Sequence, residues 1–315
     1  HNGKQMTEIS ADAMRWLWKD WPAPIKKGLG SQQMKDLLLP GEEWQLVGTG
    51  YAFTEGPASN AKGEVFFNDT PNHKTWKVGL DGTPSLFSAD AKKAGGMAFG
   101  RDGRLFAVSA DSKQVIAYDE AGRPGVVADD IAGNDVAVRA DGSLYVTAPG
   151  NSNPASNSVW LIRTSGEKAV VDTGLKDPNG VALSPDQSLL YVCDSRSHWV
   201  YSYQIQPDGT LKYRQKYDHL HQPDTADESG AEGMRCDRDG RLYVATKMGI
   251  QVCDQAGRVN CILPAPNGRV ADLCFGGPAF DTLFATCGGT VFKRKIKTRG
   301  IDPSAGPVKP VAPRL

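Results

Sequence analysis

Six stretches of similar sequence begin with residues of a restricted kind. Four of these residues carry a side-chain oxygen, and each is followed by a Gly or an Asp and then by a strand-like run. We call all six the ring residues: Glu55, Gly95, Asn134, Asn179, Glu232 and Ala271. A turn-forming role accounts for the two Asn residues but not for the two Glu residues, because Glu is a poor turn residue. The repeated oxygen therefore points to a shared chemical role.

That role follows from the oxygens themselves. Two carboxylates aimed at one point repel each other unless a positive charge lies between them. A set made only of carboxylate and amide oxygens suits a hard cation, with Ca²⁺ first and Mg²⁺ or Mn²⁺ as alternatives. The competing interpretation is a ring of solvated polar groups without metal. The combination of two carboxylates and two amides favours the metal site.

The stretches that carry these residues read as β-hairpins. Each has a short strand, a turn that often contains Asp-Gly, and a second strand rich in aromatic and β-branched residues. They begin at residues 55, 95, 134, 179, 232 and 271, with further strand-like pieces between them. Two hairpins per repeat make a four-stranded sheet, and repetition at roughly 40 to 50 residues is the signature of a β-propeller. The sequence therefore predicts an all-β, six-bladed propeller whose inner strands bring the six ring residues to one level of the central channel.

The rest of the chain falls outside the repeats. We expect an N-terminal extension over residues 1–43, the propeller over 44–300 and a Pro-rich, extended C-terminal tail over 301–315. The segment SADAMRWLWKDW has apolar residues at helical spacing, which predicts a short helix or lid within the extension.

Composition limits the classes of partner that the chain is expected to bind. Lys and Arg number 36 and Asp and Glu number 36, so there is no electrostatic case for nucleic acid or a membrane surface. The sequence contains no run of 18 or more apolar residues, so it predicts no membrane-spanning helix. The six cysteines form no CxxC pair and are expected to be buried free thiols. We expect a cytoplasmic protein, or a periplasmic one if a signal peptide has been removed; its oligomeric state is open.

At these motifs the chain resembles the senescence marker protein (regucalcin), gluconolactonase and luciferin-regenerating enzyme family, and bacterial gluconolactonases most of all. The resemblance covers roughly residues 44–297. Its motifs are FTEGPA at 53–58, GNDVAVRADGSLYVT at 133–147, DPNGVALSPDQSLLYVCDS at 177–195 and ADLCFGG at 271–277. It implies a six-bladed propeller with one divalent cation in the channel mouth and hydrolysis of sugar lactones.

The resemblance also implies roles for single residues. Glu55, Asn134 and Asn179 match metal ligands of the family, with Ca²⁺ the first choice and Mg²⁺, Mn²⁺ or Zn²⁺ as alternatives. The fourth ligand is usually an Asp that also serves as the proposed base. Here Glu232 takes that place, so we expect Glu232 to be both ligand and catalytic base. Asp135 and Asp272, which follow ring residues, are candidates to orient the ligands.

Substrate recognition cannot be carried over in the same way. Some family members have an Arg two residues before the first Asn ligand, where this chain has Ala132. The polar segment APGNSNPASNS offers Asn151 and Asn153 as candidate substrate contacts, or is an ordinary exposed loop.

The expected activity is metal-assisted hydrolysis of a gluconolactone-like sugar lactone to the aldonic acid. Two alternatives remain open at the level of sequence. One is a propeller that binds a metabolite or a protein around a structural cation without catalysis, because a fold does not fix a function. The other is a related esterase or phosphotriesterase built on the same site.

Overall fold

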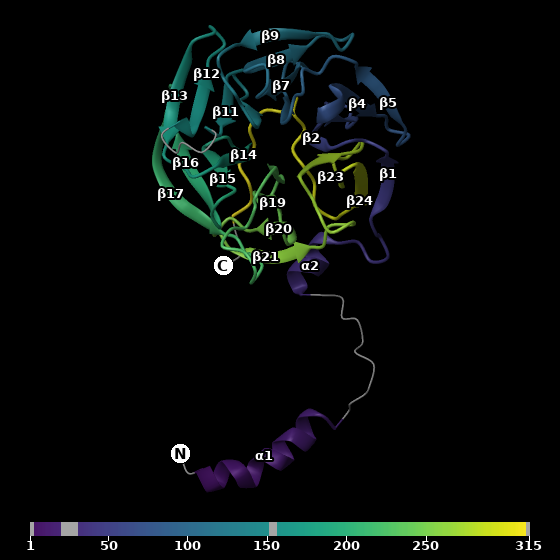
Figure 1. Cartoon of the computed structure of the whole chain (residues 1–315), viewed down its shortest axis with the longest axis vertical. Coiled ribbons are helices and arrows are strands. Elements are labelled where there is room, and N and C mark those ends of the chain that lie inside the picture. Colours follow the sequence, from purple (N-terminus) through teal and green to yellow (C-terminus); the bar gives the residue numbers. More distant parts are fainter. Residues whose placement is uncertain (1–2, 20–30, 151–155, 313–315) are drawn as a thin grey trace.

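Six antiparallel four-stranded sheets surround a central channel in the computed structural model, which describes residues 3–19, 31–150 and 156–312 (Figure 1). The predicted all-β, six-bladed propeller is thereby confirmed. Two helices precede it, α1 (Gly3–Leu17) and α2 (Gln32–Leu37), and a short 3₁₀ helix, η1 (Thr70–Asn72), lies within the first blade. No helix among the described residues has the length and apolar character needed to cross a membrane.

The first three blades follow one another along the chain, each with its innermost strand first. Blade 1 contains β2 (Thr54–Ser59), β3 (Val65–Asp69), β4 (Lys74–Val78) and β5 (Pro84–Ser88). Blade 2 contains β6 (Met97–Phe99), β7 (Leu105–Ser109), β8 (Gln114–Tyr118) and β9 (Pro124–Ala128). Blade 3 contains β10 (Val136–Val138), β11 (Leu144–Ala148), β12 (Ser158–Ile162) and β13 (Lys168–Thr173).

The last three blades continue the pattern, with an exception at the end of the ring. Blade 4 contains β14 (Pro178–Leu183), β15 (Leu189–Asp194), β16 (Trp199–Ile205) and β17 (Leu211–His219). Blade 5 contains β18 (Met234–Cys236), β19 (Leu242–Thr246), β20 (Gly249–Cys253) and β21 (Val259–Leu263). Blade 6 contains β22 (Asp272–Gly276), β23 (Thr282–Cys287) and β24 (Thr290–Lys295), and its outer strand is β1 (Gln45–Thr49).

Strand β1 closes the ring by pairing antiparallel with β24. Helix α2 strengthens the closure. Its last residue, Leu37, is buried, Leu38 forms a bridge with Ile296, and the backbone of Lys297 donates to the Leu37 carbonyl at 2.8 Å. The two ends of the propeller segment are thus held in the same blade.

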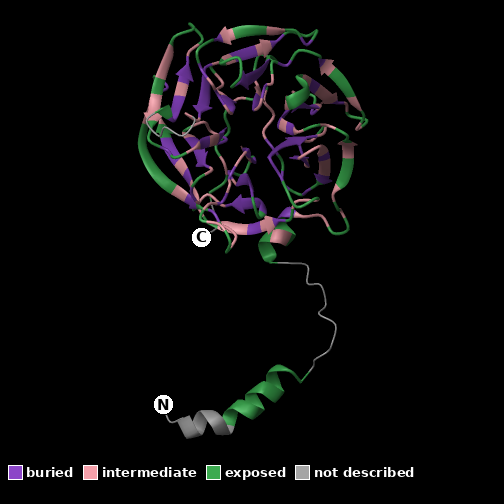
Figure 2. Cartoon of the chain, viewed as in Figure 1, coloured by how far each residue is buried: buried purple, intermediate pink, exposed green. Residues whose placement is uncertain are grey.

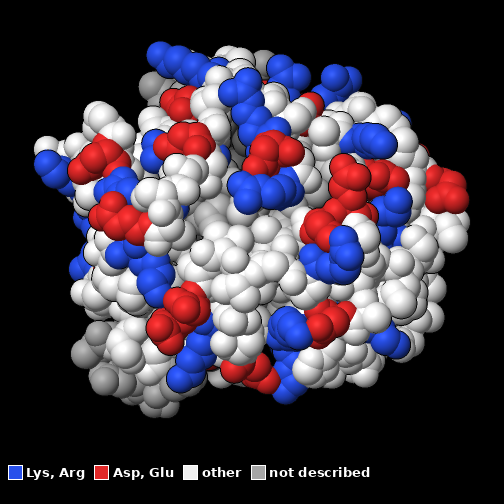
Figure 3. All heavy atoms as spheres, turned by 90° about the horizontal axis from the view of Figure 1, so that it is seen from above, with Lys and Arg blue, Asp and Glu red and all other residues white. Residues whose placement is uncertain are grey.

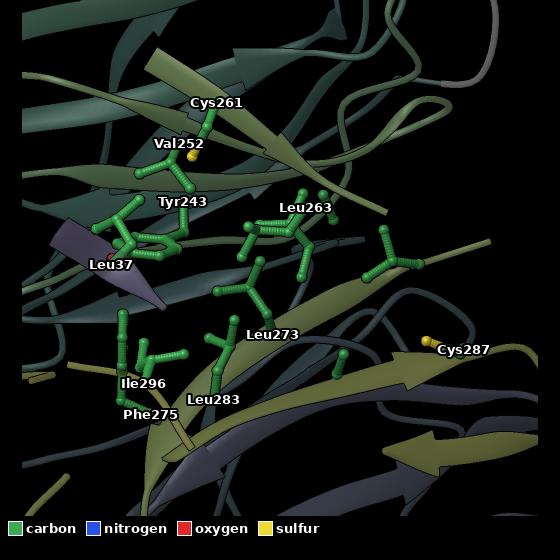
Figure 4. Close-up of a cluster of buried hydrophobic side chains, with 14 of the residues drawn as sticks. Leu37, Tyr243, Val252, Cys261, Leu263, Leu273, Phe275, Leu283, Cys287 and Ile296 are labelled. Atoms are coloured by element: carbon green, nitrogen blue, oxygen red, sulfur yellow. The ribbon is translucent and has the colours of Figure 1, made fainter. Parts of the chain in front are cut away.

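The core lies between the blades, where the buried residues of Figure 2 gather around the channel. One hydrophobic cluster fills each of the six blade interfaces. Figure 4 shows the cluster between blades 5 and 6, in which Leu37 packs beside Tyr243, Leu273 and Ile296. All six cysteines are free and buried, as predicted.

The C-terminal segment runs across the end of the channel that lies away from the ring residues. Its backbone is fixed by the Val308 N–H, which donates to the Pro185 carbonyl at 2.8 Å, and by the Arg101 Nε–H, which donates to the Ser304 carbonyl at 3.2 Å. Residues 301–307 line a pocket of about 170 Å³ together with inner-strand residues such as Phe99 and Val138. This end of the channel is therefore covered by the chain itself.

Candidate active site

The four oxygen-bearing ring residues face the channel. Glu55 lies in β2 and Asn179 lies in β14. Asn134 and Glu232 lie two residues before the first residue of β10 and of β18. Each is half-buried, while the residues on both sides of it are buried. This alternation is what an inner strand produces when one face lines a channel and the other packs against a neighbouring blade.

Hydrogen bonds place the ring residues at one level. The backbone N–H of Gly95, Asn134, Glu232 and Ala271 donates in each case to a carbonyl of the second strand of the same blade. Five bonds between blades then run from a donor in one blade to the carbonyl of the ring residue in the next blade. They are Asn68 Nδ2 to Gly95 O (2.8 Å), Gly96 N to Asn134 O (2.9 Å), Thr147 Oγ1 to Asn179 O, Gly180 N to Glu232 O (3.1 Å) and Gly233 N to Ala271 O (2.8 Å). The predicted alignment of the repeats is therefore also the spatial alignment.

Carboxylates crowd this end of the channel. Burial raises the pKa of Glu55 well above its usual value, and the nearby Asp272, Glu232 and Asp135 raise it further. Burial also raises the pKa of Glu232, against the opposing effect of the Arg269 guanidinium. The Oε2 atom of Glu232 is buried and has no hydrogen-bond partner among the described residues. An orphaned buried carboxylate oxygen is costly unless a cation or a donor reaches it.

The two amides complete a donor set that fits a hard cation. The side chains of Asn134 and Asn179 form no hydrogen bond with other described residues, so their oxygens are available to a ligand. Within the described residues no group of three or more His, Cys, Asp or Glu is arranged to hold a metal ion. A cation at the ring would therefore depend on carboxylate and amide oxygens together, which is the ligand chemistry of Ca²⁺ or Mg²⁺.

Arg235 lies on the inner side of the ring and was missed by the sequence analysis. Its Nη2 donates to the Met97 carbonyl at 3.0 Å and to the Pro57 carbonyl at 3.4 Å, and its Nη1 donates to the Met234 carbonyl at 2.7 Å. The guanidinium lies 3.5 Å from Asp135 Oδ2 and 3.7 Å from Asp272 Oδ2. Arg235 also lines the covered pocket, so it separates the ring from the other half of the channel.

The two Asp residues bind the neighbouring backbone as well. Asp135 Oδ2 accepts a hydrogen bond from Val181 N at 3.0 Å in the next blade. A Cβ atom on Gly96 would lie 2.2 Å from Asp135 Oδ1, and one on Gly233 would lie 1.7 Å from Asp272 Oδ1. Glycine at these two positions therefore makes room for the carboxylates, which turn toward Arg235.

Arg269 stands at the open side of the ring. Its Nη2 lies 3.7 Å from Glu232 Oε1, and its guanidinium lies over the Phe53 ring at 5.2 Å from the centroid. Two guanidinium groups, those of Arg235 and Arg269, therefore lie near four carboxylates, which are Glu55, Glu232, Asp135 and Asp272. One divalent cation would balance that surplus of negative charge.

The predicted substrate contacts stay untested. Asn151 and Asn153 fall outside the described residues, so their role stays a prediction. On blade 3 the residue two positions before the ring residue is Ala132, which has a small side chain. The equivalent position on blade 6 is Arg269. Over the face shown in Figure 3, positive and negative side chains are interspersed.

Comparisons with known proteins place this chain in a family. The profile of the SMP-30/Gluconolactonase/LRE-like region matches residues 53–289. A gluconolactonase from Zymomonas mobilis is 26% identical over 296 residues, which cover 81% of this chain and 82% of that protein.

Solved structures show the same fold. The structure of a gluconolactonase from Xanthomonas campestris superposes with a TM-score of 0.75 at 22% identity, covering 85% of this chain and 93% of that one. Regucalcin from Agrobacterium tumefaciens, described as a calcium-binding protein, superposes with a TM-score of 0.71 at 17% identity, covering 82% and 96%. Because the family profile spans most of the propeller, this chain belongs to the SMP-30/Gluconolactonase/LRE-like family.

Proposed function

We propose that this protein is a lactonase that depends on one divalent cation and hydrolyses a sugar lactone of the gluconolactone type to the aldonic acid. The observation that carries the proposal is the meeting of two carboxylates and two unengaged amides at one end of the channel. Membership of a family that includes a gluconolactonase 26% identical to this chain supports it.

Glu55, Asn134, Asn179 and Glu232 are the residues that would hold the cation. Ca²⁺ is the first choice because the donor set contains only oxygen, and a family structure is described as that of a calcium-binding protein. When bound, the cation supplies Lewis-acid polarisation of the lactone carbonyl.

The remaining chemistry falls to the chain's own residues. Because Oε2 of Glu232 is buried and without a partner, it is the oxygen suited to a cation, and Oε1 faces Arg269. We assign Oε1 as the atom that takes a proton from the attacking water. Arg269 opposes the rise that burial causes in the pKa of that carboxylate. Arg235 and residues of the C-terminal segment line the other half of the channel, so we assign substrate entry to the ring side.

The test is hydrolysis of glucono-δ-lactone followed by acid release, with and without a chelator. We expect turnover that EDTA abolishes and that added Ca²⁺ restores; parallel additions of Mg²⁺, Mn²⁺ and Zn²⁺ rank the cations. Equal rates in the presence and absence of chelator would overturn the metal dependence. Tight binding of the lactone without any turnover would instead identify a non-catalytic binding protein.

Replacement of Glu232 by Gln tests the base. Gln keeps one ligating oxygen and the size of the side chain but cannot accept the proton. We expect kcat to fall by about 10² to 10⁴, the usual contribution of a general base, while cation binding measured by calorimetry weakens but stays appreciable. A variant that hydrolyses lactone at the parent rate under saturating cation would remove Glu232 from the role.

A further inference from the structure

Arg269 is placed to contact any ligand that approaches the ring. It lies in the segment that enters β22, and its side chain is 63% exposed at the channel mouth. From blade 6 it reaches the Phe53 ring of blade 1 and the Glu232 carboxylate of blade 5. Its charge also lowers the pKa of Glu55, which locates the guanidinium near both carboxylates of the candidate cation site.

The donors of this guanidinium are not used within the described part of the chain. Its 3.7 Å approach to Glu232 is longer than a hydrogen bond, and no side-chain hydrogen bond from Arg269 to another described residue is formed. Some other exposed arginines are engaged. Arg104 and Arg258, for example, each donate to a neighbouring Asp, at 2.6 Å and 2.9 Å. The Arg269 guanidinium lies over the Phe53 ring, 5.2 Å from its centroid, and the five N–H donors along its edge are left for a ligand.

The other blades offer no equivalent group at this level. We call the residues two positions before the ring residues the rim residues: Phe53, Lys93, Ala132, Asp177, Gly230 and Arg269. Lys93 is engaged by Asp111 at 2.5 Å, and Asp177 is paired with Arg196 at 3.5 Å. Ala132 and Gly230 carry little or no side chain. Of these six described positions, Arg269 alone combines a cation with unengaged donors.

Charge decides what kind of group Arg269 takes. The four carboxylates around the ring are balanced by Arg235, Arg269 and one divalent cation, which leaves no positive charge over for an anionic substrate. A neutral acceptor therefore fits better than a phosphate or a carboxylate. The hydroxyl oxygens of a sugar lactone are such acceptors, and Arg has donors but no acceptor of its own.

We propose that Arg269 is the specificity-determining residue for hydroxylated lactones, donating hydrogen bonds from its free edge to hydroxyl oxygens of the substrate. The proposal rests on the lactonase function proposed above. It assigns to blade 6 the recognition of hydroxyl groups, while the carbonyl end of the lactone is handled at the ring. An unsubstituted lactone has no hydroxyl for Arg269 and gains nothing from it.

The experiment compares Arg269→Ala with the parent protein on glucono-δ-lactone and on δ-valerolactone, which has the same ring without hydroxyls. We expect kcat/KM for gluconolactone to fall about 10- to 100-fold, mainly through KM, the scale of lost charge-assisted hydrogen bonds. The value for δ-valerolactone should fall about tenfold less than that for gluconolactone, because this substrate loses only the effect of Arg269 on the pKa of Glu232. Arg269→Lys recovers part of the loss because it keeps a donor. Arg196→Ala is the matched control, since Arg196 is similarly exposed and ion-paired at the same mouth; it leaves the ratio of the two substrates unchanged.

Binding measurements separate recognition from indirect effects. By calorimetry, Arg269→Ala should bind the non-hydrolysable lactam analogue of gluconolactone at least about tenfold more weakly, while its Ca²⁺ affinity stays within about threefold of the parent or rises. An equal loss on both lactones together with weaker Ca²⁺ binding would show that Arg269 acts only through Glu232, and the proposal would fall. Unchanged kinetics on both lactones would also overturn it. If the parent hydrolyses neither lactone, the proposed function fails first and this inference with it.

Discussion

At the scale of single residues, Arg235 breaks the pattern of the sequence repeat. Three positions after each ring residue the chain has Ala58, Ala98, Ala137, Ala182, Arg235 and Cys274. Five of these side chains are small, and the space that they leave along the channel is taken by the one arginine. The position directly after the ring residue is Gly in four blades and Asp in two. These two Asp residues, Asp135 and Asp272, are the ion-pair partners of Arg235. An arginine at a repeat position that otherwise holds only Ala or Cys was the sequence signal that could have revealed Arg235.

The first prediction concerns this arginine. Arg235→Met leaves Asp135 and Asp272 buried without their cation, and removal of one partner from a buried ion pair typically costs about 3 to 5 kcal/mol. We expect a loss of that size in the free energy of unfolding, measured by urea denaturation in chelator so that cation binding does not contribute. Adding Asp272→Asn to the same variant should recover part of the loss.

The control is Arg258→Met, which breaks the exposed pair of Arg258 with Asp254. Exposed pairs contribute no more than about 1 kcal/mol. A loss for Arg235→Met no larger than that of the control would contradict the role of Arg235 as the link between blades.

The second prediction concerns Asp218, which is buried on β17, far along the chain from the ring residues. Its two carboxylate oxygens have no hydrogen-bond partner among the described residues, and burial raises its pKa to about 7. In the unfolded chain an Asp titrates near 3.9, so between these values the native state holds a proton that the unfolded state has lost. Stability from this group is therefore fully present below about pH 4 and is lost as the pH rises to about 7.

The loss is on the order of 4 kcal/mol if the whole shift is expressed. Asp218→Asn should remove this dependence, so its free energy of unfolding should exceed that of the parent at pH 8 and approach it at pH 4. Urea denaturation of both proteins across this range measures the difference. Parallel pH profiles would show that Asp218 titrates normally.

At the scale of elements, the hairpins were predictable and the closure of the ring was not. The inner two strands of each blade carry apolar runs. In blades 2, 3 and 5 an Asp-Gly turn joins them, as at Asp141–Gly142, where Gly142 has φ 86°. Strand β1 has no such mark. It reads as part of the chain before the repeats, and only its pairing with β24 makes it the outer strand of blade 6. Likewise, nothing local to Leu37 shows that it packs between blades 5 and 6.

The third prediction follows from that packing. Leu37 is 3% exposed within the interface between blades 5 and 6, whereas Leu46 on β1 is 56% exposed. Leu37→Ala should cost about 2 to 5 kcal/mol in the free energy of unfolding, through lost burial and the cavity left behind. Leu46→Ala should change it by less than about 0.5 kcal/mol. Similar urea midpoints for the two variants would mean that α2 is not part of the folded core.

At the scale of the whole molecule, the two ends of the channel differ. The ring residues gather at one end, and the C-terminal segment crosses the other end, where it lines a pocket of about 170 Å³ together with Arg235. The repeat pattern predicted that six residues converge and pointed to Asp135 and Asp272 beside them. It did not reveal Arg235 and Arg269, because these come from blades 5 and 6 and approach the carboxylates only in the folded chain. Without a cation the assembled ring therefore holds a surplus of negative charge, and this surplus has a measurable consequence.

The last prediction is a reversal of sign at Glu55. In chelator, Glu55→Gln should raise the Tm by a few degrees, because it removes one of four crowded carboxylates and keeps the size of the side chain. In saturating Ca²⁺ the order should reverse. The parent gains about 2.7 kcal/mol when the free cation is at 100 times its Kd, whereas the variant has lost a charged ligand and gains much less.

Glu64→Gln in the same blade is the control for this reversal. The Glu64 carboxylate accepts from Asn60 Nδ2 at 2.8 Å and lies 3.2 Å from Lys77 Nζ, so it is stabilised rather than crowded. Its replacement should not raise the Tm in chelator and should leave the shift caused by Ca²⁺ intact. Thermal unfolding followed by circular dichroism gives the Tm of all three proteins in both conditions. A parent protein whose Tm is the same with chelator and with each of the four divalent cations would mean that the carboxylates at the ring do not form a cation site.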